Sequence, residues 1–229
     1  MSDTLIITGA AGHLGRAVTR TMLDEGHTVE AVLGPADDPG FLQHERLYSQ
    51  EVDLLDEGQA RSYVKTMQKK HEHIAAGLLL VGGFAAGNLK QTNGAALEEM
   101  FRLNFYTAYH LVPPMLQLFR AQGGGRFVLV GTRPALVPNQ GKNLVAYSLS
   151  KGLIFQLADL INAEGRKDNI VASVVVPSTL DTPVNREAMP DADPADWVPP
   201  GQVAETIRFL LSDTGAMLRQ PVLKIYNNA

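Results

Sequence analysis

The sequence predicts an α/β fold: a single-domain, Rossmann-like, doubly wound parallel sheet with strand order 3-2-1-4-5-6-7. Short apolar runs alternate with longer amphipathic stretches along all 229 residues. Several runs are apolar at consecutive positions, which is typical of strands covered on both faces. A glycine cluster follows the first run, as in dinucleotide-binding folds. No linker or repeat interrupts the series, so one domain over residues 1–229 is expected.

The elements follow from these patterns in order. Strands are expected over residues 4–8, 28–33, 46–52 (the weakest), 74–81, 126–130, 170–176 and 222–226. Helices are expected over 13–25, 56–70, 95–122, 145–164 and 201–212. Pro113 and Pro114 should kink or divide the third helix, because proline removes a backbone donor. Two segments rich in proline and aspartate, 34–43 and 177–200, are expected to be loops.

The composition excludes several classes of protein. The 20 basic and 24 acidic residues give a formal net charge of −4, which argues against nucleic-acid binding. Cysteine is absent, so disulfides and thiolate chemistry are excluded. The longest uncharged apolar stretch, 74–86, is too short to cross a bilayer, and the N-terminal residues lack a signal-peptide pattern. We therefore expect a cytoplasmic protein that binds neither nucleic acid nor membrane.

The glycine cluster reads Thr8-Gly9-Ala10-Ala11-Gly12-His13-Leu14-Gly15, and a predicted helix begins inside it. Glycines at this spacing allow a tight turn, close approach of the backbone to a pyrophosphate and close packing of helix on strand. No Gly-Lys-Ser/Thr sequence follows, so a lysine-based phosphate loop is excluded. Cofactor contacts are expected from Gly9, Ala11, Gly12, His13, Leu14 and Gly15.

A second motif is Tyr147-Ser148-Leu149-Ser150-Lys151, in the first turns of the fourth helix. The i, i+4 spacing places Tyr147 and Lys151 on one helix face. A tyrosine of ordinary pKa near 10 is a poor proton donor at neutral pH. A cation one turn away is expected to lower the pKa of Tyr147 and make it a usable general acid–base group.

Together these motifs, and several further segments, resemble the short-chain dehydrogenase/reductase family over essentially the whole chain. The resemblance implies that Asp53 and Leu54 contact the adenine, that Gly82 and Gly83 border the cofactor, and that Asn104 holds a water near Lys151. It also implies that 177–183 closes over the nicotinamide. From that segment the expected cofactor contacts are Pro177, Thr179 and Thr182.

One departure concerns the serine that this family places about thirteen residues before the tyrosine. Pro134 stands at that offset, and Thr132 is the nearest hydroxyl and the candidate replacement. The segments around Phe84 and 179–197 are similar to those of quinonoid dihydropteridine reductase-like members of the family, which manage without this hydroxyl.

The choice of cofactor is poorly encoded. The acid that binds the adenine-side ribose is expected at the end of the second strand, where Leu33 and Gly34 stand instead, with Asp37 and Asp38 beyond a turn. That segment also supplies no cation for a 2′-phosphate, and Arg16 is expected to face the pyrophosphate. The sequence thus leaves NAD(H) and NADP(H) open and slightly favours NAD(H), with Leu33 beside the ribose.

The sequence therefore predicts an NAD(P)-dependent oxidoreductase that transfers hydride to or from a small carbonyl, alcohol or quinonoid pterin-like substrate. Tyr147 would donate the proton, with Lys151 lowering its pKa and, by resemblance, binding the nicotinamide ribose. Thr132 would orient the substrate oxygen, and Asn104 would connect Lys151 to solvent. The alternatives are a non-catalytic dinucleotide sensor and another Rossmann-type enzyme such as a methyltransferase, neither of which needs a tuned proton donor.

Two further expectations concern metals and partners. His71-Glu72-His73 lacks a third ligand, so it is interpreted as a solvated face and no metal site is expected. Helices 95–122 and 145–164 carry more apolar residues than one buried face requires. A homodimer or homotetramer is therefore predicted to pack through Phe101, Phe105, Tyr106, Tyr109, Leu153, Ile154, Phe155 and Leu157.

Overall fold

The computed structural model describes residues 3–38 and 40–228; residues 1–2, 39 and 229 lie outside this part. Within it, seven strands form one sheet in the order β3-β2-β1-β4-β5-β6-β7, and neighbouring strands are parallel. The predicted fold class and strand order are confirmed. The strands are β1 (Thr4–Thr8), β2 (Thr28–Leu33), β3 (Leu47–Glu51), β4 (Ala76–Leu79), β5 (Gly125–Val130), β6 (Ile170–Pro177) and β7 (Val222–Ile225).

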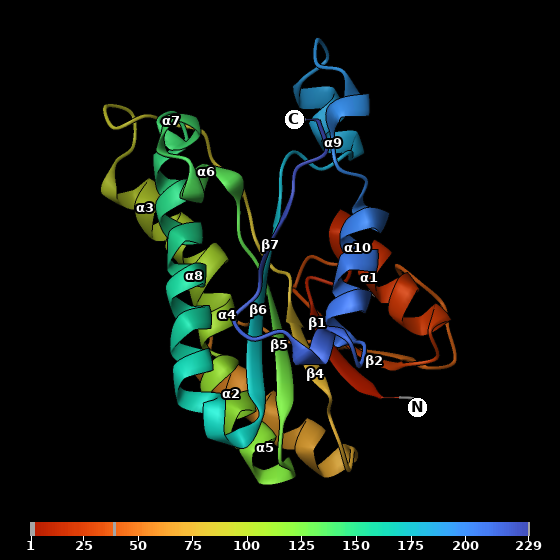
Figure 1. Cartoon of the computed structure of the whole chain (residues 1–229). Helices are drawn as coiled ribbons and strands as arrows, with labels where there is room; N and C mark the ends of the chain where they lie inside the picture. Colours follow the sequence, from red (N-terminus) through yellow and green to blue (C-terminus); the bar gives the residue numbers. More distant parts are fainter. Residues whose placement is uncertain (1–2, 39, 229) are drawn as a thin grey trace.

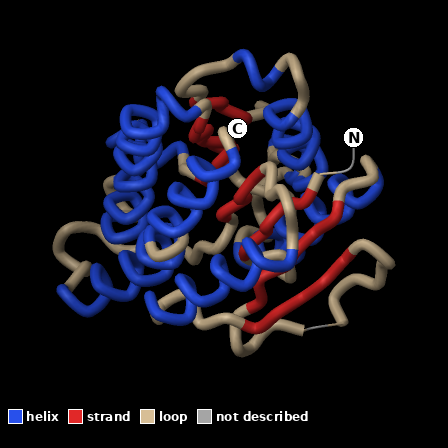
Figure 2. Tube along the Cα trace, turned by 90° about the horizontal axis from the view of Figure 1, so that it is seen from below, coloured by secondary structure: helices blue, strands red, loops and turns tan. Residues whose placement is uncertain are grey.

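Helices cover both faces of the sheet (Figures 1 and 2), which explains the consecutive apolar residues of the central strands. All eight residues of β6 are buried. In β1, Ile6 belongs to one hydrophobic cluster, whereas Leu5 and Ile7 belong to another. Successive side chains of a strand point to opposite faces, so two separate cores share this sheet.

One face of the sheet is covered by α1 (His13–Asp24) and α10 (Pro200–Leu211), which pack against each other on the right in Figure 1. Val18 and Met22 of α1 are fully buried, as are Val203 and Ile207 of α10. These positions lie four residues apart, so each helix presents one apolar stripe to the sheet.

The other face is covered by α2 (Glu57–Lys70), α5 (Val112–Gln122) and α8 (Val145–Gly165). The helix predicted over 95–122 is divided into α3 (Gly94–Phe101), a π-helical segment η1 (Arg102–Tyr106), α4 (Thr107–Tyr109) and α5. The two prolines stand in the first turn of α5, where a backbone N–H would have no helical partner in any case. The two prolines therefore begin a new helix, and the expectation that they divide the third helix is confirmed.

Several short helical segments were missed from the sequence, some after the carboxyl ends of β5 and β6 and some before the amino ends of β6 and β7. They are α6 (Arg133–Leu136), α7 (Pro138–Gly141) and α9 (Pro183–Ala188), with 3₁₀ segments η2 (Arg166–Asp168), η3 (Pro194–Asp196) and η4 (Gly215–Met217). The segment 177–200, expected as a loop, thus contains α9 and η3. Elements of three to six residues are too short to show a helical period.

Two isolated backbone bridges tie these segments to the rest of the molecule. Gly87 pairs with Leu144, which joins the segment after β4 to the start of α8. Leu180 pairs with Val198, which joins the two ends of the segment that carries α9. The segment after β4 and the segment that carries α9 are therefore each held in place where they leave the sheet.

The expectation that His71 lies on a solvated face is wrong. Its Nε2 lies 2.7 Å from Glu30 Oε1, and Lys70 Nζ donates to the same oxygen at 2.7 Å. The Glu30 side chain, on β2, is only 4% exposed. The carboxylate needs these partners because an unpaired charge is costly to bury. Among the described residues, no cluster of three potential metal ligands is found.

Candidate active site

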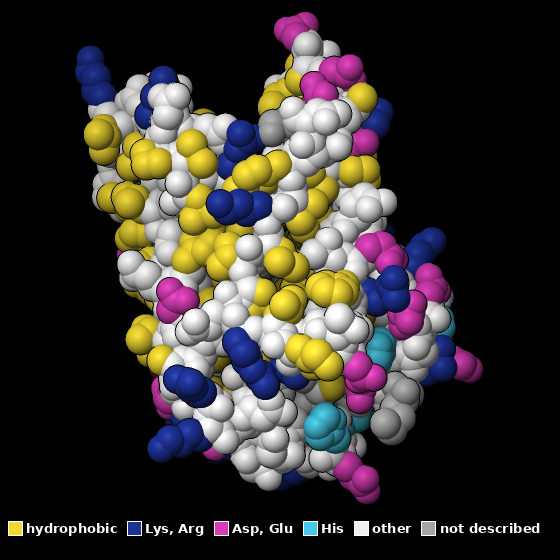
Figure 3. All heavy atoms as spheres, in the orientation of Figure 1, with side chains coloured by type: hydrophobic (Ala, Val, Ile, Leu, Met, Phe, Trp, Pro, Cys, Tyr) yellow, Lys and Arg dark blue, Asp and Glu magenta, His cyan; other side chains and the backbone are white. Residues whose placement is uncertain are grey.

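The predicted site residues gather at the carboxyl ends of the strands. In Figure 3 a notch opens at this end of the molecule, between the part carrying α3 and α7 and the part carrying α9 (Figure 1). Loops that follow parallel strands meet at one edge of the sheet, which is where open α/β folds bind their ligands. The individual side chains show what this edge can bind.

The glycine turn after β1 forms a cradle for an anion. Gly9 has a φ of +63°, and a Cβ on Gly15 would lie 2.0 Å from the Gly9 carbonyl oxygen. Gly12 caps α1 without any side-chain hydrogen bond, so the first backbone N–H groups of the helix stay available. His13 beside it is exposed and Leu14 is half-buried. This turn fits a dinucleotide pyrophosphate, because side chains are absent where the backbone must approach it.

The end of β2 differs from expectation in two ways. Asp37 folds back so that its Oδ2 accepts from Gly34 N at 2.8 Å, next to Leu33. A carboxylate thus does lie beside the end of this strand. Arg16 extends from the glycine turn to the loop after β2: its Nε donates to Ala11 O at 2.7 Å and its Nη1 to Phe41 O at 3.1 Å.

The residues after β3 are placed as a pair. Asp53 Oδ1 accepts from Leu55 N at 2.9 Å, which fixes the turn. Leu54 is buried, and its carbonyl oxygen lies 2.8 Å from His110 Nδ1. Side-chain and backbone contacts therefore hold this segment at the same edge of the sheet as the glycine turn.

Tyr147 and Lys151 lie on α8 as the spacing predicted. Lys151 Nζ donates to Val130 O at 3.1 Å, and burial lowers the pKa of Lys151 to about 8. The expectation of a lowered pKa for Tyr147 is not met. Burial raises the pKa of Tyr147, and a hydrogen bond with the Thr132 side chain opposes that shift.

Thr132 and Phe84 border the Tyr147 side chain. Thr132 is buried and precedes α6, and its hydrogen bond with Tyr147 puts a second hydroxyl beside the phenol. Phe84, whose segment was singled out by resemblance but which was not named as a site residue, packs edge-on against the Tyr147 ring with 5.2 Å between centroids. The Phe84 side chain is 65% exposed, so one wall of this site is aromatic.

Asn104 is buried in η1 and contacts protein groups on both sides. Its Oδ1 accepts from Gly83 N at 2.9 Å, and its Nδ2 donates to Ser150 Oγ at 3.0 Å. A Cβ on Gly82 would lie 2.8 Å from Lys151 Nζ and 2.9 Å from Asn104 Oδ1. Gly82 therefore leaves open a small space that the lysine and the amide share. The expected water-mediated link from Asn104 to Lys151 stays a prediction.

The last predicted segment follows β6, which ends at Pro177. Thr179 O accepts from Val198 N at 2.8 Å, as part of the bridge that closes the α9 segment. Thr182 is buried, and its Oγ1 accepts from Asn185 N at 3.3 Å, so it caps α9. An ion pair between Asp181 and Arg186, at 2.6 Å, holds the same turn.

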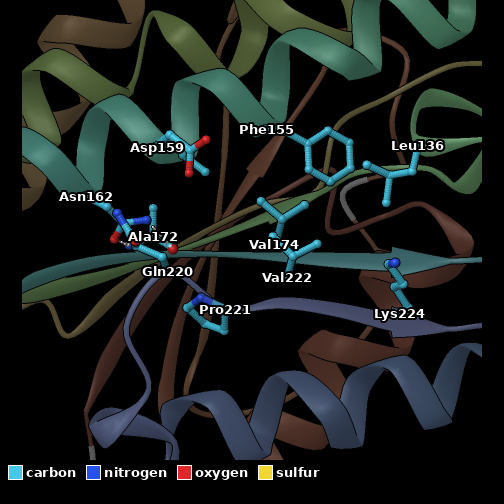
Figure 4. Close-up of a pocket in the computed structure, with 11 residues that line it drawn as sticks. Leu136, Phe155, Asp159, Asn162, Ala172, Val174, Gln220, Pro221, Val222 and Lys224 are labelled. Atoms are coloured by element: carbon cyan, nitrogen blue, oxygen red, sulfur yellow. Dashed lines mark hydrogen bonds between the residues drawn. The ribbon is translucent and has the colours of Figure 1, made fainter.

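A groove lies elsewhere on the molecule, between α8 and the strands β6 and β7 (Figure 4). Phe155, Val174 and Val222 line its apolar part, and Asp159 and Lys224 stand at its edges. It contains none of the predicted site residues. The candidate site is therefore the notch above the sheet and not this groove.

Comparison with known proteins identifies the family. Residues 3–193 match the model of the family described as short chain dehydrogenase. The chain belongs to the short-chain dehydrogenase/reductase family. As a member, it is an NAD(P)-dependent oxidoreductase. This establishes the class of enzyme and of cofactor that the glycine turn and the Tyr147–Lys151 pair predicted.

Individual relatives differ in their printed activities. Dihydropteridine reductase of Dictyostelium discoideum is 26% identical over 216 residues, covering 90% of this chain and 87% of the relative. The 3-oxoacyl-[acyl-carrier-protein] reductase FabG of Aggregatibacter actinomycetemcomitans is 24% identical over 246 residues and covers 98% of both chains. The two relatives act on unlike substrates, so similarity alone does not select one.

A solved structure supports the fold. ElxO, solved with NADP bound, superposes with a TM-score of 0.90 at 18% identity, over 98% of this chain and 97% of that one. Over the described residues, no helix has both the length and the apolarity needed to span a membrane.

Proposed function

We propose that this enzyme reduces a small carbonyl compound or a quinonoid pterin-like compound, with Tyr147 as the proton donor. The observation that carries the proposal is the grouping of Tyr147, Thr132 and Lys151 at the carboxyl end of β5. Two hydroxyls face one another there, and a buried ammonium lies one helical turn away. This arrangement suits a reaction in which an oxygen or nitrogen gains a proton as a neighbouring atom gains hydride.

Each side chain has a separate task. Thr132 orients the substrate atom that gains the proton, and Tyr147 donates that proton. Lys151 favours the phenolate that remains, because an ammonium nearby stabilises the anion. The bound nicotinamide supplies or accepts the hydride. Gly9, Gly12 and Gly15 hold the pyrophosphate, and the segment from Pro177 to Thr182 covers the nicotinamide.

The substitution Tyr147→Phe tests this assignment. It removes the proton donor and leaves the ring, so kcat is expected to fall by about 10²-fold or more while the affinity for the reduced cofactor stays near normal. Steady-state assays should include a carbonyl series and a quinonoid pterin, with cofactor binding followed by fluorescence. Tyr48→Phe, on the exposed strand β3, is the matched control. Full activity of Tyr147→Phe on a true substrate would exclude Tyr147 as the donor.

The non-catalytic alternative predicts a different outcome from the same assay. A dinucleotide sensor would bind the cofactor with no turnover of any substrate in either series, and Tyr147→Phe would change nothing measurable. The buried Lys151 argues against that alternative, because a sensor gains nothing from an ammonium whose pKa is lowered to about 8 by burial.

We also propose that the enzyme prefers NAD(H) to NADP(H). The Asp37 carboxylate beside Gly34 N supports this preference. An acid there accepts hydrogen bonds from the ribose hydroxyls and repels a 2′-phosphate. Arg16 lies across the same loop through Phe41 O and Ala11 O, so it is the group most able to oppose this preference.

Titration with NADH and NADPH tests the preference. The wild type should bind NADH more tightly, and Asp37→Asn should reduce that affinity about tenfold, as expected for a lost hydrogen bond to a charged group. Asp38→Asn is the control, since Asp38 Oδ1 accepts instead from Gly40 N. Tighter binding of NADPH by the wild type, lost in Arg16→Ala, would reverse the assignment.

Finally, we propose a homodimer or homotetramer that forms through α4 and α8. Of the residues first expected at this surface, Ile154 and Leu157 are buried in the core, which corrects that part of the expectation. Exposed apolar side chains remain at Tyr109, Leu149 and Leu160.

Location in the cytoplasm stays a prediction that cell fractionation would test.

A further inference from the structure

Ser150 lies between the two motif residues of α8 and has no solvent-exposed surface. Its Oγ donates to Tyr147 O at 2.9 Å and accepts from Asn104 Nδ2 at 3.0 Å. A hydroxyl group has one proton. Because that proton is committed to the Tyr147 carbonyl, Ser150 can only accept from Asn104.

This arrangement fixes the direction of the Asn104 amide. Its NH₂ end must face Ser150, so its oxygen end faces the opposite side. There Oδ1 accepts from Gly83 N at 2.9 Å and borders the space at Gly82 into which Lys151 Nζ also points. A reversed amide would place a donor against the Gly83 N–H and would leave the oxygen facing another acceptor.

This orientation of the Asn104 amide stabilises the charged form of Lys151. Lys151 Nζ donates to Val130 O at 3.1 Å, and burial is the cause that lowers its pKa, with no carboxylate opposing the shift. A partial negative charge on the Gly82 side therefore stabilises the buried ammonium. With the amide reversed, an NH₂ group would face the ammonium and repel it.

We propose that Ser150 is a positioning residue: it holds the Asn104 amide with its oxygen toward Gly83 and Lys151. The proposal rests on the proposed function, in which the Lys151 ammonium tunes Tyr147. Ser150 itself touches neither substrate nor cofactor. It acts through Asn104, and the chain of contacts runs from α8 to η1 and on to the segment after β4.

The first test uses the cofactor-free protein. In Ser150→Ala the NH₂ group loses its oxygen acceptor and keeps only the weaker contact with Met100 Sδ at 3.6 Å. The Gly83 amide proton should therefore move in the NMR spectrum and exchange faster with solvent. Ser148→Ala is the matched control, because the Ser148 hydroxyl has no hydrogen-bond partner among the described residues. It should leave Gly83 unchanged. An unchanged Gly83 signal in folded Ser150→Ala would overturn the proposal.

The second test uses kinetics. Ser150→Ala should lower kcat about ten- to a hundredfold, the scale of a misplaced catalytic group, with cofactor affinity nearly unchanged. In an Asn104→Ala background the same substitution should add no further loss, since its effect passes through that amide. Equal losses in both backgrounds would show that Ser150 acts by another route. Ser148→Ala should leave kcat unchanged in both.

A third variant covers the case in which Ser150→Ala fails to fold. Ser150→Thr keeps the hydroxyl and adds one methyl group, so it should keep the Gly83 signal and most of kcat. Loss of the Gly83 signal in folded Ser150→Thr would count against the proposal. If the wild type turns over no substrate while the Gly83 result holds, the proposed function fails and the role of Ser150 in orienting Asn104 stands.

Discussion

At the scale of single residues, the buried Lys151 side chain lowers the stability of the folded protein. Its ammonium is buried beside Val130 O, and burial lowers its pKa from 10.5 to about 8. Below pH 8 the side chain is charged in both folded and unfolded chains, so the folded state bears the whole cost of burying the charge. Between pH 8 and 10.5 the unfolded chain binds more protons, so stability rises with pH.

Lys151→Met should therefore stabilise the cofactor-free protein while abolishing turnover. The expected gain in the free energy of unfolding at pH 7 is roughly 1–3 kcal/mol. Denaturant unfolding at pH 7, 8 and 9.5 measures it, and the rise of stability above pH 8 should disappear in the variant. Lys142→Met, at an exposed position, should change neither. A less stable Lys151→Met at pH 7 would contradict the cost of burial.

Spacing alone could predict Tyr147, Lys151 and the glycine turn, because their chemistry depends on positions close together in the chain. Ser150, Phe84 and the inward turn of Asp37 could not be predicted in this way. Ser150 and Phe84 become significant only through groups distant in sequence, as when Ser150 meets Asn104 across 46 positions. Asp37 was assigned beyond the end of β2 because sequence distance does not show that a turn folds back.

At the scale of elements, the strands were predictable to within one residue at each end except β4, which was expected to begin two residues earlier and to end two residues later. The largest error in the predicted bounds of an element was the third helix, which was expected to be continuous over 95–122 except at its prolines. Its apolar period continues from Met100 to Met115, so the sequence cannot show that hydrogen bonding changes inside η1. There Thr107 N donates to Arg102 O, and the Thr107 hydroxyl donates to Leu103 O at 2.7 Å.

Glu30 is the second feature of this scale, because it joins β2 to the end of α2. Glu30→Ala should lower the free energy of unfolding by about 1.5–3 kcal/mol, the range for hydrogen bonds to charged groups. The loss is limited because the Lys70 side chain is 41% exposed and can turn to water. Thermal or denaturant unfolding measures the change.

Glu57→Ala is the control for that measurement. The exposed Glu57–Arg61 pair lies on the same helix, and such pairs contribute less than about 1 kcal/mol. Equal losses in the two variants would show that the buried carboxylate does not fasten α2 to the sheet.

At the scale of the whole molecule, the two cores fill both faces of the sheet, and the remaining apolar surface lies outside them. Leu149 and Leu160 are eleven residues apart on α8, close to three full turns, so they share one outward face. Both are more than half exposed. Covering such a face is favourable, which is the physical reason to expect a second copy of the chain there.

Leu149→Glu with Leu160→Glu should therefore reduce the assembly to a monomer. Light scattering at micromolar concentration measures the mass of the wild type and of the double variant. Met217→Glu is the control, because that side chain is 79% exposed and lies in η4, which packs beside α10. A wild type that is already monomeric would refute the predicted oligomer.

The bridge between Leu180 and Val198 has a consequence for how such a chain can diversify. It makes residues 181–197 a loop whose two ends lie next to each other. A loop of this kind can be lengthened, shortened or replaced by another loop without shifting the pairing of any strand. The segment proposed to cover the nicotinamide can therefore change in length or sequence while the strands of the sheet keep their pairing.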